Sequence, residues 1–248
     1  MRRAPLAVLA LLLLGAACGD DDGDAVRRAS TTTTDAGPTS TTSADGTTST
    51  TEITCQPARL PDDASDLEEG AGDVDGDGRV DELRSYRTAD GWHVQVELAS
   101  GGGADLSAGL TDAGGFGVIG GADVDGDGAD EVWARTGAGA SAVIVGLARL
   151  DGCSLTRVAL ESGEAADFPA GGSVGTAAGL ECAATDPSAH VTTYTASNTG
   201  DTTYTVEVVE HRLDGNVLRE VARRTETTEV GDDLFARATA FRCGDLAL

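Results

Sequence analysis

The chain has 248 residues and a formal net charge of −25, because 42 acidic residues stand against 17 basic ones. Its apolar content of 40% is enough to build a core, so the composition excludes a wholly disordered chain. A surface this acidic repels phosphate backbones, which excludes nucleic acid as a partner and suits divalent cations.

The first residues have the pattern of an export signal. Two early arginines precede the apolar run 6–14, which is too short to cross a bilayer core of about 30 Å. Cys18 follows three small residues, and this arrangement resembles the lipobox of bacterial lipoproteins, although Gly15 stands where that family usually has leucine. The resemblance implies a signal peptide at 1–17 and a lipid on Cys18 that anchors the protein to the outer face of the bacterial cytoplasmic membrane. The alternative is a secreted protein with an incidental cysteine.

Residues 18–52 have the composition of a stalk. From Ser30 to Thr51, 15 of 22 residues are Ser or Thr, and none is a large apolar residue. Such a stretch cannot bury enough surface to offset its ordering entropy, so we expect it to be disordered. The folded domain is therefore expected at 53–248.

Two stretches that start 50 residues apart, at Asp73 and Asp123, share one acidic template. Carboxylates stand at positions 1, 3, 5 and 9, and glycines stand at positions 4 and 6. Calcium takes six to eight oxygen ligands at about 2.3–2.6 Å, and alternating Asp side chains in a tight turn can supply several of them. Position 7 would add a backbone carbonyl. The predicted calcium ligands are Asp73, Asp75, Asp77, Arg79 and Asp81 in the first loop and Asp123, Asp125, Asp127, Ala129 and Glu131 in the second.

The flanking residues distinguish these loops from an EF-hand. Position 12 of an EF-hand is a bidentate Glu, whereas Arg84 and Ala134 stand there. Strand-like residues follow instead, and an Asp-rich nine-residue loop that opens onto a strand resembles the FG-GAP (VCBS-type) repeat of integrin-like β-propellers. The resemblance covers about ten residues per loop and implies that the loop joins the first two strands of a blade and binds calcium. Glu131 departs from the family's usual Asp but is still an oxygen ligand.

The repeat continues beyond the two loops. A shift of 59 residues aligns Asp123 with Cys182, in a third unit whose loop lacks an all-oxygen ligand set. A further shift of 61 reaches Cys243, because residues 241–243 echo residues 180–182. Within the later units the strand patterns cover 142–150, 155–160, 191–196, 203–213 and 217–230.

These patterns predict an all-β domain of about three propeller-blade-like antiparallel units, followed by the first strand of a fourth. The usual ring of the FG-GAP family has seven blades, so three units are too few to close it. Either the sheets form a compact β domain, an incomplete propeller, or another chain closes the edges. We favour a compact monomer, because disulfides can staple a small core.

Besides Cys18 there are four cysteines, an even number that predicts two disulfides in an exported chain, with three possible connectivities. The repeat alignment places Cys153 and Cys182 on the same side of neighbouring units. It therefore favours a Cys153–Cys182 bridge, which leaves Cys55 to pair with Cys243. A zinc site built from Cys182, Asp186 and His190 is the weaker alternative.

Two short motifs have alternative explanations. Residues 115–120 match GxGxxG, but no helix pattern follows and the adjacent Asp cluster would repel phosphate. Residues 171–175 match GxSxG around Ser173, and His190 and His211 follow, but the βα units of a hydrolase are missing from the pattern. Like the remaining histidine, His93, these two are expected on strand faces.

The leading functional prediction is an exported, lipid-anchored calcium-binding surface or envelope protein. We expect no enzymatic activity, and we expect a non-catalytic module that binds an unknown protein or glycan. The alternative is an exported serine hydrolase that uses Ser173. Trp92 and Trp133 are expected first in the core and only second as platforms for a sugar.

Overall fold

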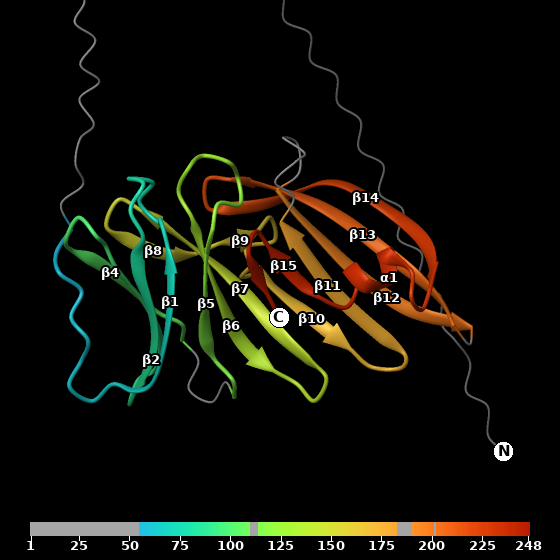
Figure 1. Cartoon of the computed structure of the whole chain (residues 1–248), viewed down its shortest axis with the longest axis horizontal. Helices are drawn as coiled ribbons and strands as arrows, with labels where there is room; N and C mark the ends of the chain where they lie inside the picture. The colour runs from blue at the N-terminus through green and yellow to red at the C-terminus, as the bar shows by residue number, and fades with distance from the viewer. Residues whose placement is uncertain (1–54, 110–113, 183–189, 201) are drawn as a thin grey trace, which may run out of the picture. The chain divides into compact units, whose positions relative to one another are not determined.

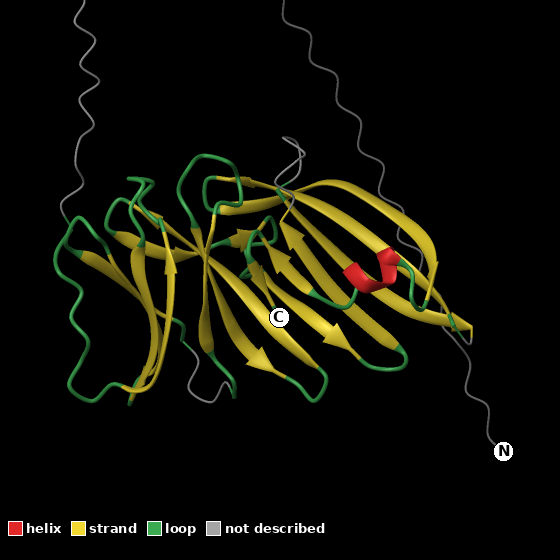
Figure 2. Cartoon of the chain, viewed as in Figure 1, coloured by secondary structure: helices red, strands yellow, loops and turns green. Residues whose placement is uncertain are grey.

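The structure is a computed structural model that describes residues 55–109, 114–182, 190–200 and 202–248. The expected signal peptide, Cys18 and the stalk lie outside the described residues. Strands make up most of the described chain, and one short helix, α1 (Asp233–Arg237), accompanies them (Figure 2). The fold is therefore all-β, as the sequence predicts.

The first sheet is a four-stranded antiparallel meander in which the strands follow the chain order (Figure 1). Leu83 and Val96 lie opposite each other on neighbouring strands, and both are fully buried. Burial of such cross-strand apolar pairs fixes the register, because a shift by one residue would turn them outward. The strands are β1 (Ser65–Gly72), β2 (Asp81–Thr88), β3 (Gly91–Glu97) and β4 (Gly103–Ser107).

The second sheet has twelve strands. Its main order is β5-β6-β7-β10-β11-β12-β13-β14-β9, while β8 pairs with β7, β15 with β11 and β16 with β15. The strands are β5 (Gly117–Ala122), β6 (Glu131–Ala138), β7 (Ala142–Asp151), β8 (Ser154–Arg157), β9 (Ala159–Leu160), β10 (Asp167–Gly172), β11 (Thr176–Cys182), β12 (Val191–Gly200), β13 (Thr203–Asp214), β14 (Val217–Glu229), β15 (Phe241–Cys243) and β16 (Leu246–Ala247).

The second sheet differs from the three separate units that the repeat predicts. β5, β6, β7 and β8 form one antiparallel meander, and β11, β12, β13 and β14 form another. β10 joins them, because it pairs with the first half of β7 and with β11. The predicted strand positions themselves are confirmed, although the stretch 155–160 divides into β8 and β9.

Both tryptophans lie in the core, which confirms the first expectation for them. Trp133 is fully buried and meets Phe241 edge to face, with ring centroids 5.2 Å apart. Trp92 stacks on Phe116 with a centroid distance of 5.1 Å. The Trp92 cluster packs the first sheet against β6, β7 and β8, so the two sheets share apolar contacts.

The disulfides use all four expected cysteines, but the predicted pairing is wrong. Cys55 pairs with Cys153, and Cys182 pairs with Cys243. Cys153 lies in the β7–β8 turn, which contacts the segment before β1, whereas β10 separates β7 from β11 in the sheet. The predicted Cys153–Cys182 bridge is therefore incompatible with this topology.

The echo between residues 180–182 and 241–243 has a structural explanation. β11 and β15 are parallel neighbours, and their register pairs Leu180 with Phe241 and Cys182 with Cys243. The two cysteines are thus brought to a Cα–Cα distance of 4.5 Å, which suits a disulfide. The similarity between residues 180–182 and 241–243 therefore reflects two strands that pair with each other, and residues 241–243 do not start a separate unit.

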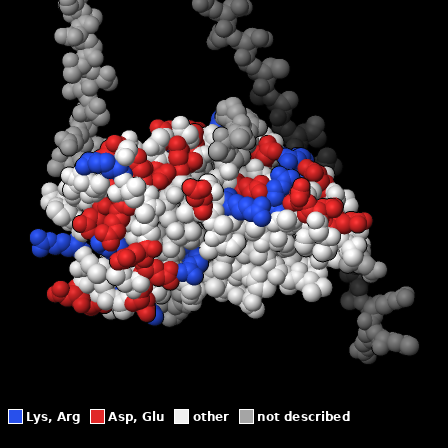
Figure 3. Space-filling view, in the orientation of Figure 1, with Lys and Arg blue, Asp and Glu red and all other residues white. Residues whose placement is uncertain are grey.

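The outer strands of the second sheet carry opposite charges side by side. Arg223 pairs with Glu207 and Glu220, while Arg224 pairs with Glu210. Figure 3 shows basic and acidic side chains next to one another in the region where Figure 1 draws β13 and β14. Such charges on an exposed strand discourage pairing with another sheet edge.

His211 of β13 gives a prediction for pH dependence. Burial lowers the pKa of His211, whose Nε2 lies 3.2 Å from the Thr193 hydroxyl. Below pH about 6.5 the unfolded state therefore binds a proton that the folded state does not, and stability falls as the pH falls, by about 1.4 kcal/mol per pH unit until the lowered pKa is reached. Urea unfolding of the parent and of His211→Gln at pH 7.5 and 5.5 measures the effect. The variant should lose less stability on acidification, and an equal loss in both proteins would contradict the prediction.

Candidate metal centre

The first acidic loop joins β1 to β2. Gly76 and Gly78 have φ angles of 68° and 82°, which the tight turn requires and which glycine adopts without strain. The Asp73 carboxylate closes the turn by accepting a hydrogen bond from the Gly78 N–H at 2.8 Å. One carboxylate oxygen from each of Asp73, Asp75 and Asp81 comes within 4.8 Å of the others, so the loop gathers three acidic groups at one point.

Asp81 anchors this loop to the sheet. It is the first residue of β2, is 1% exposed, and accepts hydrogen bonds from the N–H groups of Val74 at 2.9 Å and Ala99 at 2.8 Å. Burial raises the pKa of Asp81, and the negative charges of Asp75 and Asp73 raise it further. A cation beside these groups would remove the cost of holding them together.

The second acidic loop joins β5 to β6 and repeats the arrangement. Oxygens of Asp123, Asp125 and Glu131 lie within 4.8 Å of one another. Glu131 is 1% exposed and accepts a hydrogen bond from the Val124 N–H at 2.9 Å, as Asp81 does in the first loop. Burial raises the pKa of Glu131 to about 8.

Three of the five predicted ligands in each loop are thus brought together. The carboxylates of Asp77 and Asp127 turn instead to arginines, Arg79 and Arg149 respectively. The predicted backbone ligands, the carbonyls of Arg79 and Ala129, remain predictions.

Asp130 and Arg149 belong to the site but were missed by sequence reasoning. Asp130 joins the two loops, because its side chain accepts a hydrogen bond from the Asp73 N–H at 2.8 Å and its N–H donates to the Asp73 carbonyl at 2.7 Å. β1 and β5 approach closely there, since a Cβ on Gly72 would lie 2.7 Å from the Gly121 Cα. The glycines near the start of the loops, Gly72 directly before the first and Gly121 two residues before the second, are the signal in the sequence for this contact.

The donor set fits calcium. Asp73, Asp75 and Asp81 offer only carboxylate oxygens. These are hard ligands, which suit calcium better than they suit softer metals. A calcium ion would supply positive charge where burial and mutual repulsion disfavour ionised carboxylates. Asp123, Asp125 and Glu131 offer the same chemistry in the second loop.

The predicted zinc alternative is wrong. Its thiolate ligand is absent, because Cys182 forms a disulfide with Cys243. His190 accepts a hydrogen bond at Nδ1 from the Leu213 N–H at 3.0 Å. Asp186 lies outside the described residues.

Ser173 lies in the turn between β10 and β11, where its N–H donates to the Thr176 carbonyl at 2.8 Å. Within the part of the chain that the structure describes, its hydroxyl has no hydrogen bond to a histidine. The GxGxxG match ends inside β5, and the next element is the strand β6. Neither motif therefore has the strand–helix context that its chemistry needs.

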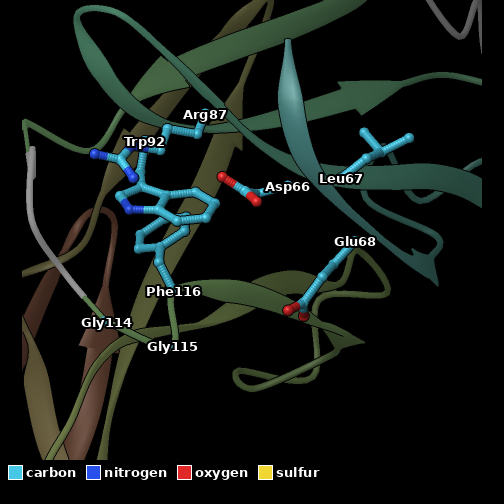
Figure 4. Close-up of a pocket in the computed structure, with 8 residues that line it drawn as sticks. All are labelled: Asp66, Leu67, Glu68, Arg87, Trp92, Gly114, Gly115 and Phe116. Carbon is cyan, nitrogen blue, oxygen red and sulfur yellow. The ribbon is translucent and has the colours of Figure 1, made fainter.

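A hollow of about 540 Å³ lies at the end of the first sheet opposite the acidic loop (Figure 4). Asp66 points toward the Trp92 ring in this view, while Phe116 and Arg87 lie beside that ring. Trp92 is only 8% exposed, and the Arg87 guanidinium lies 5.9 Å from its centroid. The aromatic wall is therefore already covered, and Trp133 is fully buried, so neither tryptophan provides a sugar platform.

Comparisons of the chain with protein-family models, with curated proteins and with solved structures each found no match. Among the described residues, no helix has the length and apolar character needed to cross a membrane. The geometry of the two loops is therefore the basis on which a function can be argued.

Proposed function

We propose that this protein is an exported calcium-binding module that acts by non-catalytic interaction with a protein or glycan partner. The observation that carries the proposal is the meeting of three carboxylates in each of two equivalent hairpin loops, with one of the three fully buried. An ionised carboxylate in such a position is costly unless a cation accompanies it. A divalent oxygen-seeking cation is the ligand that this donor set favours.

The FG-GAP resemblance supports the same conclusion. It implies an acidic loop between the first two strands of a four-stranded blade, and β1–β4 have that order. We propose that β1–β4 and β5–β8 are blade-like units and that bound calcium pins the first hairpin of each. The role of the ion would then be structural, holding a binding surface in shape.

The two disulfides support an oxidising compartment, because such bridges persist outside the reducing cytosol. We propose that a lipid on Cys18 holds the protein at the outer face of the bacterial cytoplasmic membrane and that residues 18–52 act as its stalk. Secretion without the lipid is the other form of this proposal. Detection of a lipid-modified N-terminal peptide by mass spectrometry distinguishes the two.

Thermal melting of the full chain tests calcium binding. With 1 mM calcium and a Kd of about 0.1 mM, one site adds about 1.4 kcal/mol of stability, which raises Tm by roughly 3–6 °C over the value in chelator. Asp75→Asn should reduce this calcium-dependent rise while changing Tm in chelator very little. Asp62→Asn, at an exposed position outside the loops, is the matched control. An equal Tm in calcium and in chelator for the parent protein would overturn the proposal.

A further inference from the structure

We infer that the two acidic loops are unequal and that Arg149 is the resident cation of the second, so that calcium binds first and more tightly at the first loop. This inference rests on the proposed function, because it concerns how the same two loops share the ion. The first six residues of the two loops are identical. The main difference at the centre of the clusters comes from β7, which lies outside both loops.

In the first loop, the carboxylates accept hydrogen bonds from neutral groups of the β3–β4 turn. The Ala99 N–H donates to Asp81 at 2.8 Å, and the Ser100 hydroxyl donates to Asp75 at 3.4 Å. The loop's own Arg79 pairs with Asp77 at the exposed rim. These contacts orient the acidic groups without supplying a positive charge at their centre.

In the second loop, the guanidinium of Arg149 contacts the three carboxylates that are equivalent to Asp75, Asp77 and Asp81. The repeat offset of 50 residues places Arg149 at the position of Ala99. Its Nη1 donates to Asp125 at 2.7 Å and lies 3.5 Å from Glu131, while its Nη2 donates to Asp127. Ala129 stands where the first loop has Arg79. The arginine of the second cluster is therefore Arg149 from β7, and it lies at the centre of the cluster rather than at its rim.

The surroundings of Arg149 strengthen these contacts. The Asp125 side chain is 13% exposed, Glu131 is 1% exposed, and Arg149 itself is 23% exposed, whereas Asp127 at the rim is 41% exposed. The ion pairs with Asp125 and Glu131 are therefore screened less by water and salt than surface pairs. Arg149 also donates to the Gly215 carbonyl at 3.4 Å, which ties the second loop to the β13–β14 turn.

Calcium must displace this guanidinium before it can reach all three carboxylates of the second loop. A hydrogen bond between charged groups corresponds to roughly a tenfold change or more in an equilibrium constant, and Arg149 makes two of them with Asp125 and Asp127. We therefore expect the second loop to bind calcium about a hundredfold more weakly than the first.

A calorimetric calcium titration of the full chain tests the inference. The parent should show one tight step, which Asp75→Asn removes, and one weak step, which Asp125→Asn removes. In Arg149→Ala the weak step should tighten by about a hundredfold and approach the tight one. Arg149→Gln, whose amide can still donate to Gly215, should shift the weak step in the same direction and serves if the alanine variant does not fold.

Arg157→Ala is the matched control, because Arg157 is also about one-quarter exposed, with 28% of its side chain accessible, and pairs with Asp167 away from both loops. It removes the same charge and should leave both calcium steps unchanged. Two steps of equal affinity in the parent, or an unchanged weak step in both Arg149 variants, would overturn the inference while leaving the proposed function intact. Absence of calcium binding from the parent and every variant would overturn the proposed function itself.

Discussion

Replacing Cys55 and Cys153 together with alanine is expected to lower the free energy of unfolding by about 4.7 kcal/mol, the largest effect that we predict for the loss of one interaction in this chain. The bridge spans a sequence separation of 98 residues. A cross-link over so long a loop removes much of the conformational freedom of the unfolded chain, which raises the free energy of that state. Urea unfolding of the parent and the double variant under one set of conditions measures the difference.

The same measurement checks the pairing. Once Cys55 is replaced, replacing Cys153 should cost little more, because the bridge is already lost. Replacing Cys153 and Cys182 together should cost about 9 kcal/mol, since it breaks two bridges with expected contributions of about 4.7 and 4.3 kcal/mol. If that combination cost no more than one bridge, the pairing of Cys55 with Cys153 would be contradicted.

Asp81→Ala is expected to lower the free energy of unfolding by about 3 kcal/mol in calcium, because it leaves one buried and one partly buried N–H group without acceptors, each at a cost of about 1–3 kcal/mol. These donors belong to Val74 and Ala99. The variant should also lose the stabilisation that calcium gives the first loop. In chelator the loss should be smaller, because burial raises the pKa of Asp81 and the substitution removes a carboxylate that is costly to ionise. Urea unfolding with 1 mM calcium and with chelator separates the two contributions.

Asp77→Ala is the control within the same loop. Asp77 pairs with Arg79 at the exposed rim and does not belong to the group of three carboxylates. The substitution should therefore change the free energy of unfolding very little, and the calcium-dependent rise in Tm should remain. If Asp77→Ala weakened the response to calcium as much as Asp81→Ala, the assignment of ligands would have to change.

The features that could be predicted from sequence are those set by neighbouring residues. The acidic template and its glycines fix a tight turn within a few residues, and alternating apolar residues fix the strands on either side. Asp73, Asp75 and Asp81 therefore lie where the pattern places them. The carboxylate of Asp77 turns away because the adjacent Arg79 attracts it, an outcome that spacing alone does not indicate.

The remaining features depend on contacts between distant parts of the chain. The disulfide pairing follows from the positions of β10 and β15 in the sheet, and neither strand has a partner that its own residues specify. The place of Arg149 depends on how β7 passes the loop between β5 and β6. A single arginine near the end of a strand pattern gives no sign of this, because any exposed strand end can carry one.

The position of β15 has a consequence for the order in which the chain can fold. Its Cys243 comes 61 residues after Cys182, so a chain that emerges N-terminus first can complete the Cys55–Cys153 bridge while Cys182 still has no native partner. Cys153 and Cys182 enclose the shortest loop between successive cysteines from Cys55 onward, and we therefore expect rapid oxidation to favour that wrong pair early in folding. Thiol–disulfide exchange, which takes seconds to hours, must then release Cys182 before the last strand can join the sheet. We therefore expect the yield of native protein to rise with slow oxidation or with a disulfide isomerase, and a chain cut before Cys243 would leave Cys182 without its native partner.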